Sequence, residues 1–407
     1  MNKKKVIMAQ HESKTLGAVF LIAGTAIGAG MLGLPIATGA SGLAASTTIL
    51  LLMFAYMLGT LFLFLEAMYY CPNPSTNLIG LCRKLSGPLT ESLVWLLFLS
   101  LLYVAAASYM LGSGEIIASS FSLFKGKKVL AACLFSLFFG GLAFFKMAWI
   151  DRLNRLLIIG LLGAFILLIA TSVPHIQVSH FSGGTPILAL TAIPVIVTSF
   201  TSHIILPSIR TYLDNNLPLL KKAIFIGCGL PLAFYITWEI VILGLLPHSG
   251  EYSLLSILNA NQDGLSLLIE YLNHHYQVNY FAQLVAIFSF FAIATSFWGV
   301  MISLRDFIED GLNLERYRYH KLYAISLAFF PPLAMIFISP SGFSVFLHYA
   351  GIIILLLYGI TPIYLVYRAR YRLKLSSSYT LPGGTWSLLA LFIITLLILT
   401  STVFLVV

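Results

Sequence analysis

The stretch AGTAIGAGMLGLP, from Ala23 to Pro35, is the most informative part of this sequence. It lies in a long apolar run, yet it contains four glycines, and Thr25 is its single polar side chain. Each glycine weakens a helix by about 1 kcal/mol relative to alanine. Gly24 and Gly28 could be a small-xxx-small pair that packs helices closely. Alternatively, the run is unwound at mid-membrane, where bare backbone groups are tolerated only beside a cavity.

A second interrupted run, AIPVIVTSFTSHIILPSIRTYL, extends from Ala192 to Leu213. Pro194 and Pro207 bracket a polar cluster, residues 198–203, that is unusual in a membrane helix. In transporters built from an inverted repeat, interrupted helices occupy matching positions in the two halves and form the transport site. The pair therefore favours the unwound interpretation and predicts that helices 1 and 6 are broken.

The whole chain has the composition of an integral membrane protein. Of its 407 residues, 59% are hydrophobic and only 9% are charged, whereas soluble domains carry about 25% charged residues. A membrane helix needs about 20 apolar residues, and these runs do not alternate as barrel strands do. We predict an all-α polytopic protein with about eleven transmembrane helices, at 17–37, 43–70, 90–121, 129–148, 155–173, 187–209, 223–246, 279–304, 322–339, 343–366 and 385–406.

Basic residues predict the orientation of these helices. With a cytoplasmic tail at 1–16, 20 of the 23 Lys and Arg residues fall in inner segments, and the other three lie at 125–128. This asymmetry predicts a cytoplasmic N-terminus and a periplasmic C-terminus. It also accounts for the net charge of +9 without a nucleic-acid partner. The four cysteines show no paired spacing, so we expect small apolar helix residues rather than disulfides.

The longest outer segment, 247–278, contains two short amphipathic runs separated by Asn261-Gln262-Asp263-Gly264. Such a break indicates a turn between two short helices. They form either a lid over the outer mouth or a plain interfacial connector.

A broken helix pair suits a zwitterionic substrate. Half-helix N-termini present N–H groups to a carboxylate, and half-helix C-termini present carbonyls to an ammonium group. No protein charge then needs to be buried at the midplane. This arrangement predicts a carrier of amino acids.

Five stretches, in order along the chain, resemble the bacterial hydroxy- and aromatic-amino-acid permeases, which include tyrosine- and tryptophan-specific permeases of the amino acid/polyamine/organocation superfamily. They are GTAIGAGMLGLP (Gly24–Pro35), LLYVAAASYMLGSGE (Leu101–Glu115), TSFTSHIILPSIRTYL (Thr198–Leu213), GLPLAFYITWE (Gly229–Glu239) and ATSFWGV (Ala294–Val300). The resemblance implies a LeuT-type five-plus-five inverted repeat, 17–173 and 187–366, with an extra helix at 385–407. It also implies ion-driven import of aromatic amino acids across a bacterial inner membrane.

The resemblance further implies the residues of the substrate site. We expect the substrate to contact Thr25, Ala26, Gly28, Ala29, Gly30, Tyr103, Ser108, Tyr109, Phe200, Thr201, Ser202 and His203. Sodium-dependent members of the fold would place a cation at positions matching Gly24, Ile27, Ala292, Thr295 and Ser296. Thr295 and Ser296 could equally bond back to their own helix.

The bacterial aromatic permeases are regarded as proton symporters, so the resemblance favours protons over sodium. Ionisable residues inside spans are functional candidates, and we consider Glu115, His203 and Glu239 as proton carriers. Glu66 lies near the inner end of its span, where it is expected to snorkel.

Two other classes of function remain. A channel would need rings of charge or carbonyl filters, normally built by symmetric subunits, whereas one chain here supplies two different breaks. An enzyme would need a nucleophile, metal set or acid/base pair, and the sequence contains no HExxH or GxSxG motif. We expect no cofactor, and as partners only the amino acid and the lipid bilayer.

Overall fold

The computed structural model describes residues 3–141, 147–260, 264–276, 280–340 and 342–406, and these residues are overwhelmingly helical. Nine helices within these ranges are long and apolar enough to cross a membrane, and a bent pair makes a tenth. The predicted span at 129–148 corresponds to the shorter helix α6 (Lys128–Gly141), whose continuation at 142–146 lies outside the described residues. The chain is therefore an all-helical, multi-pass membrane protein.

The continuous spans are α3 (Leu43–Tyr69), α5 (Pro88–Ser120), α7 (Met147–Ser172), α10 (Leu217–Leu245), α13 (Tyr280–Gly311), α14 (His320–Ile338) and α17 (Gly384–Val406). One composite span consists of η7 (Pro186–Ala192), α8 (Ile193–Ser199), η8 (His203–Ile205) and α9 (Leu206–Tyr212). Another consists of α15 (Phe343–Ile354), η10 (Leu355–Ile360), α16 (Thr361–Tyr367) and η11 (Arg368–Arg372). The short connecting helices are α4 (Leu78–Leu85), η3 (Ser122–Phe124), η5 (Val173–His175), η6 (Val178–Phe181), α11 (Leu254–Asn259), α12 (Gly264–Tyr276) and η9 (Leu314–Arg316).

Span one is interrupted where the glycines predicted it. Helix α1 (Lys3–Ala26) stops, and a segment of η1 (Ala29–Gly33), α2 (Leu34–Thr38) and η2 (Gly39–Ser41) continues at an angle of 45°. Proline then restarts the helix, because Pro35 lies in the first turn of α2, where a missing N–H leaves no hydrogen bond broken. Pro207 plays the same part in α9, after the interruption of the sixth span.

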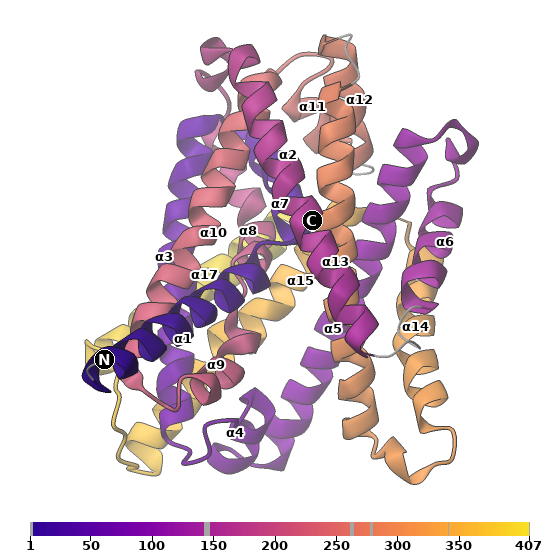
Figure 1. Ribbon diagram of the computed structural model, residues 1–407. Helices are drawn as coiled ribbons and strands as arrows, with labels where there is room; N and C mark the ends of the chain where they lie inside the picture. The colour runs from indigo at the N-terminus through magenta and orange to yellow at the C-terminus, as the bar shows by residue number, and fades with distance from the viewer. Residues whose placement is uncertain (1–2, 142–146, 261–263, 277–279, 341, 407) are drawn as a thin grey trace.

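The bundle has two different ends. One end, which we call the basic end, carries α4, α9 and η9 and lies at the bottom of Figure 1. The opposite end, the lid end, carries α11 and α12, the two short helices predicted within 247–278. Residues 29–41, which we call the lid half of span one, are buried at every position.

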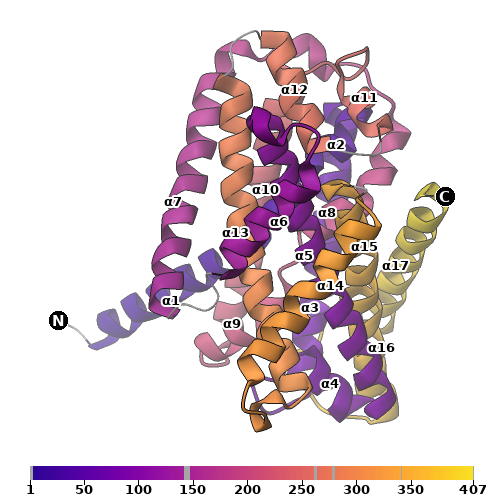
Figure 2. The ribbon, with the colours of Figure 1, turned by 90° about the vertical axis from the view of Figure 1, so that its right-hand side faces the viewer.

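The two halves of span one have different surroundings. A Cβ on Gly39 of the lid half would lie 2.7 Å from the Leu254 side chain of α11, so α11 packs directly on this segment. Helix α1, by contrast, packs along α10 and exposes Leu16, Phe20 and Leu21 on its other side. Figure 2 shows α1 extending away from the body of the bundle. The centre of the molecule is thus covered toward the lid end.

Candidate functional site

The first break is held open by a serine from another span. Gly28 is extended (φ −164°, ψ −156°), and a Cβ on it would lie 2.5 Å from the Ser296 Oγ of α13. The same Oγ accepts a hydrogen bond of 2.9 Å from the backbone N–H of Ala29. Tyr109 of α5 lies close to Ser296. Glycine is required at position 28 because the serine occupies the space of a side chain.

The second break lies directly beside the first. A Cβ on Gly30 would lie 3.2 Å from both Cα and Oγ of Ser199, the last residue of α8. The hydroxyls of this segment bond back to their own helix, Ser199 to the Val195 carbonyl at 2.9 Å and Thr201 to the Val197 carbonyl at 2.7 Å. Such internal bonds let polar side chains lie in an apolar span, so these two hydroxyls are locally satisfied.

Tyr235 joins the two breaks, and sequence reasoning missed it. Its hydroxyl lies 2.7 Å from the Ala26 carbonyl and 2.7 Å from the Ser199 carbonyl, and its side chain is fully buried in α10. Ala26 ends α1 and Ser199 ends α8, so two helix C-termini converge on one phenol. Helix C-termini carry partial negative charge. A single hydroxyl proton serves one carbonyl fully at a time, so this point suits a positively charged group.

Several predicted substrate residues gather here. Ala26, Gly28, Ala29 and Gly30 surround the first break, and Tyr109 reaches it through Ser296. Phe200 packs edge-on against Tyr235 with ring centroids 5.0 Å apart. A signal for Tyr235 was present, because it lies within the GLPLAFYITWE stretch.

Other predicted residues lie elsewhere. Thr25 is exposed and bonds back to the Leu21 carbonyl. Tyr103 donates to the Leu327 carbonyl of α14, and Ser108 donates to the Phe343 carbonyl of α15. Ser202 contacts Cys228 through their Oγ and Sγ atoms at 3.7 Å. None of these hydrogen bonds is to a residue of the first break.

His203 occupies a separate buried site. Its Nε2 lies 3.1 Å from the Thr60 hydroxyl of α3, and its ring stacks on Tyr358 at 4.7 Å. Its Nδ1 has no hydrogen-bond partner among the described residues. The histidine thus faces α3 and η10 rather than the first break.

The side chains at the positions expected for a cation hydrogen-bond to other protein groups. Thr295 bonds to the Phe291 and Ala292 carbonyls of its own helix, and Ser296 accepts from Ala29. Gly24 is exposed, and Ile27 is half-buried with its N–H bonded to the Ala23 carbonyl. Among the residues that the structure describes, no group of three or more His, Cys, Asp or Glu side chains is placed to hold a metal ion.

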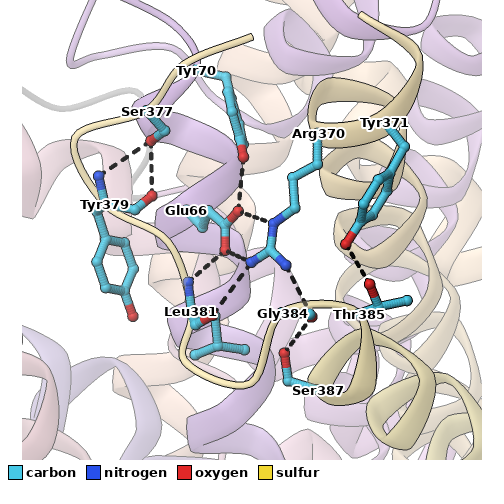
Figure 3. Close-up of polar contacts among 10 residues, drawn as sticks. All are labelled: Glu66, Tyr70, Arg370, Tyr371, Ser377, Tyr379, Leu381, Gly384, Thr385 and Ser387. Carbon is cyan, nitrogen blue, oxygen red and sulfur yellow. Dashed lines mark hydrogen bonds and ion pairs between the residues drawn. The ribbon is translucent and has the colours of Figure 1, made fainter. Parts of the chain in front are cut away.

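Three glutamates inside the bundle are fully buried: Glu66, Glu115 and Glu239. Glu66 does not snorkel as expected from the sequence. It binds the guanidinium of Arg370 through both oxygens, at 2.7 and 2.6 Å, and also accepts from Tyr70 and from the Leu381 N–H (Figure 3). The prediction was wrong because Arg370, 304 positions away in the sequence, brings its charge to the carboxylate.

Glu115 and Glu239 lie toward the lid end. Glu115 accepts from the N–H of Phe343 at 2.8 Å and of Leu265 at 3.2 Å, at the first turns of α15 and α12. Glu239 has one hydrogen-bond partner among the described residues, the Thr38 hydroxyl at 2.7 Å, and its Oε2 has none. The three carboxyl groups are therefore satisfied to very different degrees.

Comparison with known proteins agrees with this geometry. The chain is 30% identical to tyrosine-specific transport system 1 of Haemophilus influenzae, over 95% of this chain and 96% of that one. It is 28% identical to the tryptophan-specific transport protein of the same organism, over 93% of both chains. A crystal structure of the Eremococcus coleocola manganese transporter, in complex with an aromatic bis-isothiourea substituted compound, superposes with a TM-score of 0.66. That match has 14% identity and covers 97% of this chain and 88% of the other, so it shows a shared fold.

The family model for tryptophan/tyrosine permeases matches residues 11–403, which is nearly the whole chain. The sequence resemblance is thereby confirmed, and so is the expectation of a transporter rather than an enzyme. The chain belongs to the tryptophan/tyrosine permease family.

Proposed function

We propose that this protein imports aromatic amino acids, tyrosine or tryptophan, across a bacterial inner membrane by proton symport and alternating access. The proposal includes eleven transmembrane helices in a LeuT-type five-plus-five inverted repeat with one added helix. It also includes a cytoplasmic N-terminus and a periplasmic C-terminus.

One observation supports the site more than any other: the C-termini of α1 and α8 converge on Tyr235, while the N–H groups that open η1 lie two to three residues further on. An amino acid would place its ammonium group near the Ala26 and Ser199 carbonyls. Its carboxylate would approach the Ala29 N–H, which Ser296 now caps. Both charges are then met by backbone groups, in agreement with helix-terminus recognition.

The coupling ion is part of the proposal. A fully buried carboxyl group, that of Glu239, bonds Thr38 in the lid half of span one and is a group that can bind a proton. The positions expected for sodium contribute no carboxylate, and the Ser296 hydroxyl among them already accepts a hydrogen bond from Ala29. This supports protons over sodium.

The first experiment is uptake of labelled tyrosine and tryptophan into proteoliposomes that contain the purified protein. A pH gradient, a sodium gradient and an uncoupler are applied in separate arms. We expect saturable uptake of one or both amino acids that the pH gradient drives and the uncoupler abolishes. Uptake no greater than in empty liposomes would overturn the proposal, and uptake driven by sodium alone would overturn its proton arm.

Gly28→Leu tests the site within that assay. The leucine side chain would collide with Ser296, and such overpacking costs about 1–3 kcal/mol, so we expect uptake to fall at least about fivefold. Gly163→Leu is the matched control, because a Cβ on Gly163 of α7 would have no other atom within 4 Å. Normal uptake by Gly28→Leu would show that the first break is not where substrate binds.

A further inference from the structure

Glu239 differs from the other buried carboxyl groups of the bundle in how little it is satisfied. It is fully buried, its Oε2 has no donor among the described residues, and no ion pair of those residues includes it. An ionised carboxylate buried in this way is strongly unfavourable. From this geometry we infer that Glu239 carries the coupling proton. It is neutral while the lid half of span one is packed on α10, and it is ionised only after that segment has moved away. The inference rests on the proposed proton symport.

The single proton of the Thr38 hydroxyl indicates which protonation state of Glu239 fits this geometry. Thr38 Oγ1 lies 2.8 Å from the Leu34 carbonyl and 2.7 Å from Glu239 Oε1, but it has only one proton. A neutral Glu239 donates its proton to Thr38 Oγ1, and Thr38 donates to the Leu34 carbonyl, so both short distances are hydrogen bonds. An ionised Glu239 takes the threonine proton, and the Leu34 carbonyl then loses that donor. The neutral acid is the form in which every short contact is favourable.

The position of this pair connects protonation to gating. Thr38 ends α2, in the lid half of span one, and Glu239 lies on α10 one helical turn from Tyr235, on the same face. The pair thus joins the segment that covers the site to the helix that holds both breaks. When Glu239 loses its proton, its carboxylate needs water, and the lid half must separate from α10 to admit it.

The other titratable groups near Glu239 are less suited to carry the coupling proton. His175 of η5 and His180 of η6 lie on segments that pack against α10. The His175 ring approaches the Thr171 carbonyl at 3.2 Å, and the His180 ring approaches the Gly244 carbonyl at 3.2 Å. Burial holds the pKa of His180 below its ordinary value, which disfavours its charged form. Within α10 itself the nearest such groups are Tyr235 and Cys228, which contact carbonyls of the breaks and Ser202.

The other two proton candidates are placed differently. Both oxygens of Glu115 accept backbone N–H groups at the first turns of α12 and α15, an arrangement that stabilises its ionised form. His203 faces Thr60 and Tyr358, on α3 and η10, rather than the lid half of span one. Of the three candidates, Glu239 is the one that combines an unsatisfied atom with a bond to that segment.

The transport step balances simply. A proton from the lid side joins the Glu239 carboxylate while the lid half of span one stands away from α10, and the lid half then packs on α10 with the amino acid bound. After the substrate has left toward the basic side, the lid half shifts from α10 again, water from the basic side reaches Glu239, and the same proton leaves to that side. No other covalent bond changes. One proton and one zwitterion cross together, so each cycle moves one positive charge.

The test uses the full chain in proteoliposomes, with labelled tyrosine and tryptophan as probes and a pH dye inside. In the wild type, a pH gradient of about two units can drive roughly 100-fold accumulation at one proton per substrate, since one unit corresponds to a factor of ten. For Glu239→Gln we expect accumulation to fall to the level of passive equilibration and substrate-driven proton entry to disappear. Exchange of internal for external substrate, which needs no net proton movement, should remain measurable.

Glu251→Gln is the matched control, because Glu251 is an exposed carboxylate in the connecting segment that follows α10. It should accumulate substrate as the wild type does. Glu239→Asp keeps an acid at the position and should retain proton entry with an altered pH profile. If Glu239→Gln fails to reach the membrane, the pH profile of Glu239→Asp becomes the test. A profile identical to that of the wild type would contradict the inference.

The remaining outcomes separate the two proposals. Proton-driven accumulation by Glu239→Gln would overturn the assignment of the proton to Glu239 and leave the proposed function intact. A wild type that transports neither amino acid would overturn the proposed function itself.

Discussion

The polar clusters around Glu66 and Glu239 show two ways to bury a carboxyl group in one helix bundle. At the basic end, Glu66 receives two guanidinium bonds, a phenol and a backbone N–H, which join α3 to η11 and to the segment before α17 (Figure 3). On α10, next to the lid half of span one, Glu239 accepts or shares one hydrogen bond, with the Thr38 hydroxyl, and its Oε2 has no donor among the described residues. The first cluster holds three segments in one arrangement. The second cluster is stable in this conformation only when Glu239 is neutral. Loss of the proton therefore favours a different conformation.

The largest effect should come from Arg370→Ala. Removal of one partner from a buried ion pair leaves an uncompensated charge, and such changes cost about 3–5 kcal/mol. Thermal unfolding of the purified protein in detergent measures this loss of stability. The double variant Glu66→Ala/Arg370→Ala should lose less than the sum of the two single variants, because the groups are directly coupled. Additive losses would mean that the ion pair does not hold the basic end together.

Glu115→Ala should have an intermediate effect. It deprives two buried N–H groups, those of Leu265 and Phe343, of their acceptor, and an unsatisfied buried donor costs about 1–3 kcal/mol. The loss should appear locally, as faster hydrogen exchange at the first turn of α12. Unaltered exchange there would contradict a role for Glu115 in holding α12 in place. Glu115→Gln, which keeps one acceptor oxygen, should lie between alanine and wild type.

The same substitution at both carboxyl groups gives the finest comparison. Glu239→Gln should change stability by less than about 1 kcal/mol, because an amide replaces a neutral acid of similar size and can still donate to Thr38. Glu66→Gln should cost about 2 kcal/mol or more, because it leaves Arg370 with an uncharged partner. Equal losses in the two variants, measured in the same unfolding experiment, would show that the two clusters are of one kind.

The sequence predicted most of the spans and both interruptions because these depend on local composition. Glycines at 24, 28, 30 and 33 and the prolines at 194 and 207 are visible without any knowledge of neighbours. Tyr235 and the Glu66–Arg370 pair could not be found in this way. Their partners are distant in sequence, and the rotation of a helix about its axis decides which residues meet.

Helix rotation also explains the predicted residues that lie elsewhere. Thr25, Tyr103 and Ser108 are on helices that contribute to the site or lie next to it, but their side chains point to other carbonyls. An apolar helix buried on most sides has no polar face from which its rotation could be inferred. Tyr235 had the same residue type as Tyr103, and only the packing of α10 against both breaks distinguishes it.

The phenol of Tyr235 also provides a natural probe of the transport cycle. Its oxygen is within bonding distance of two backbone segments, the ends of α1 and α8, so a movement of one against the other would change its surroundings. A fluorine atom on that ring would sense each such movement as a change in its magnetic resonance frequency, with no bulky label near the substrate. The residue that closes the site in this structure could therefore report how long each conformation lasts.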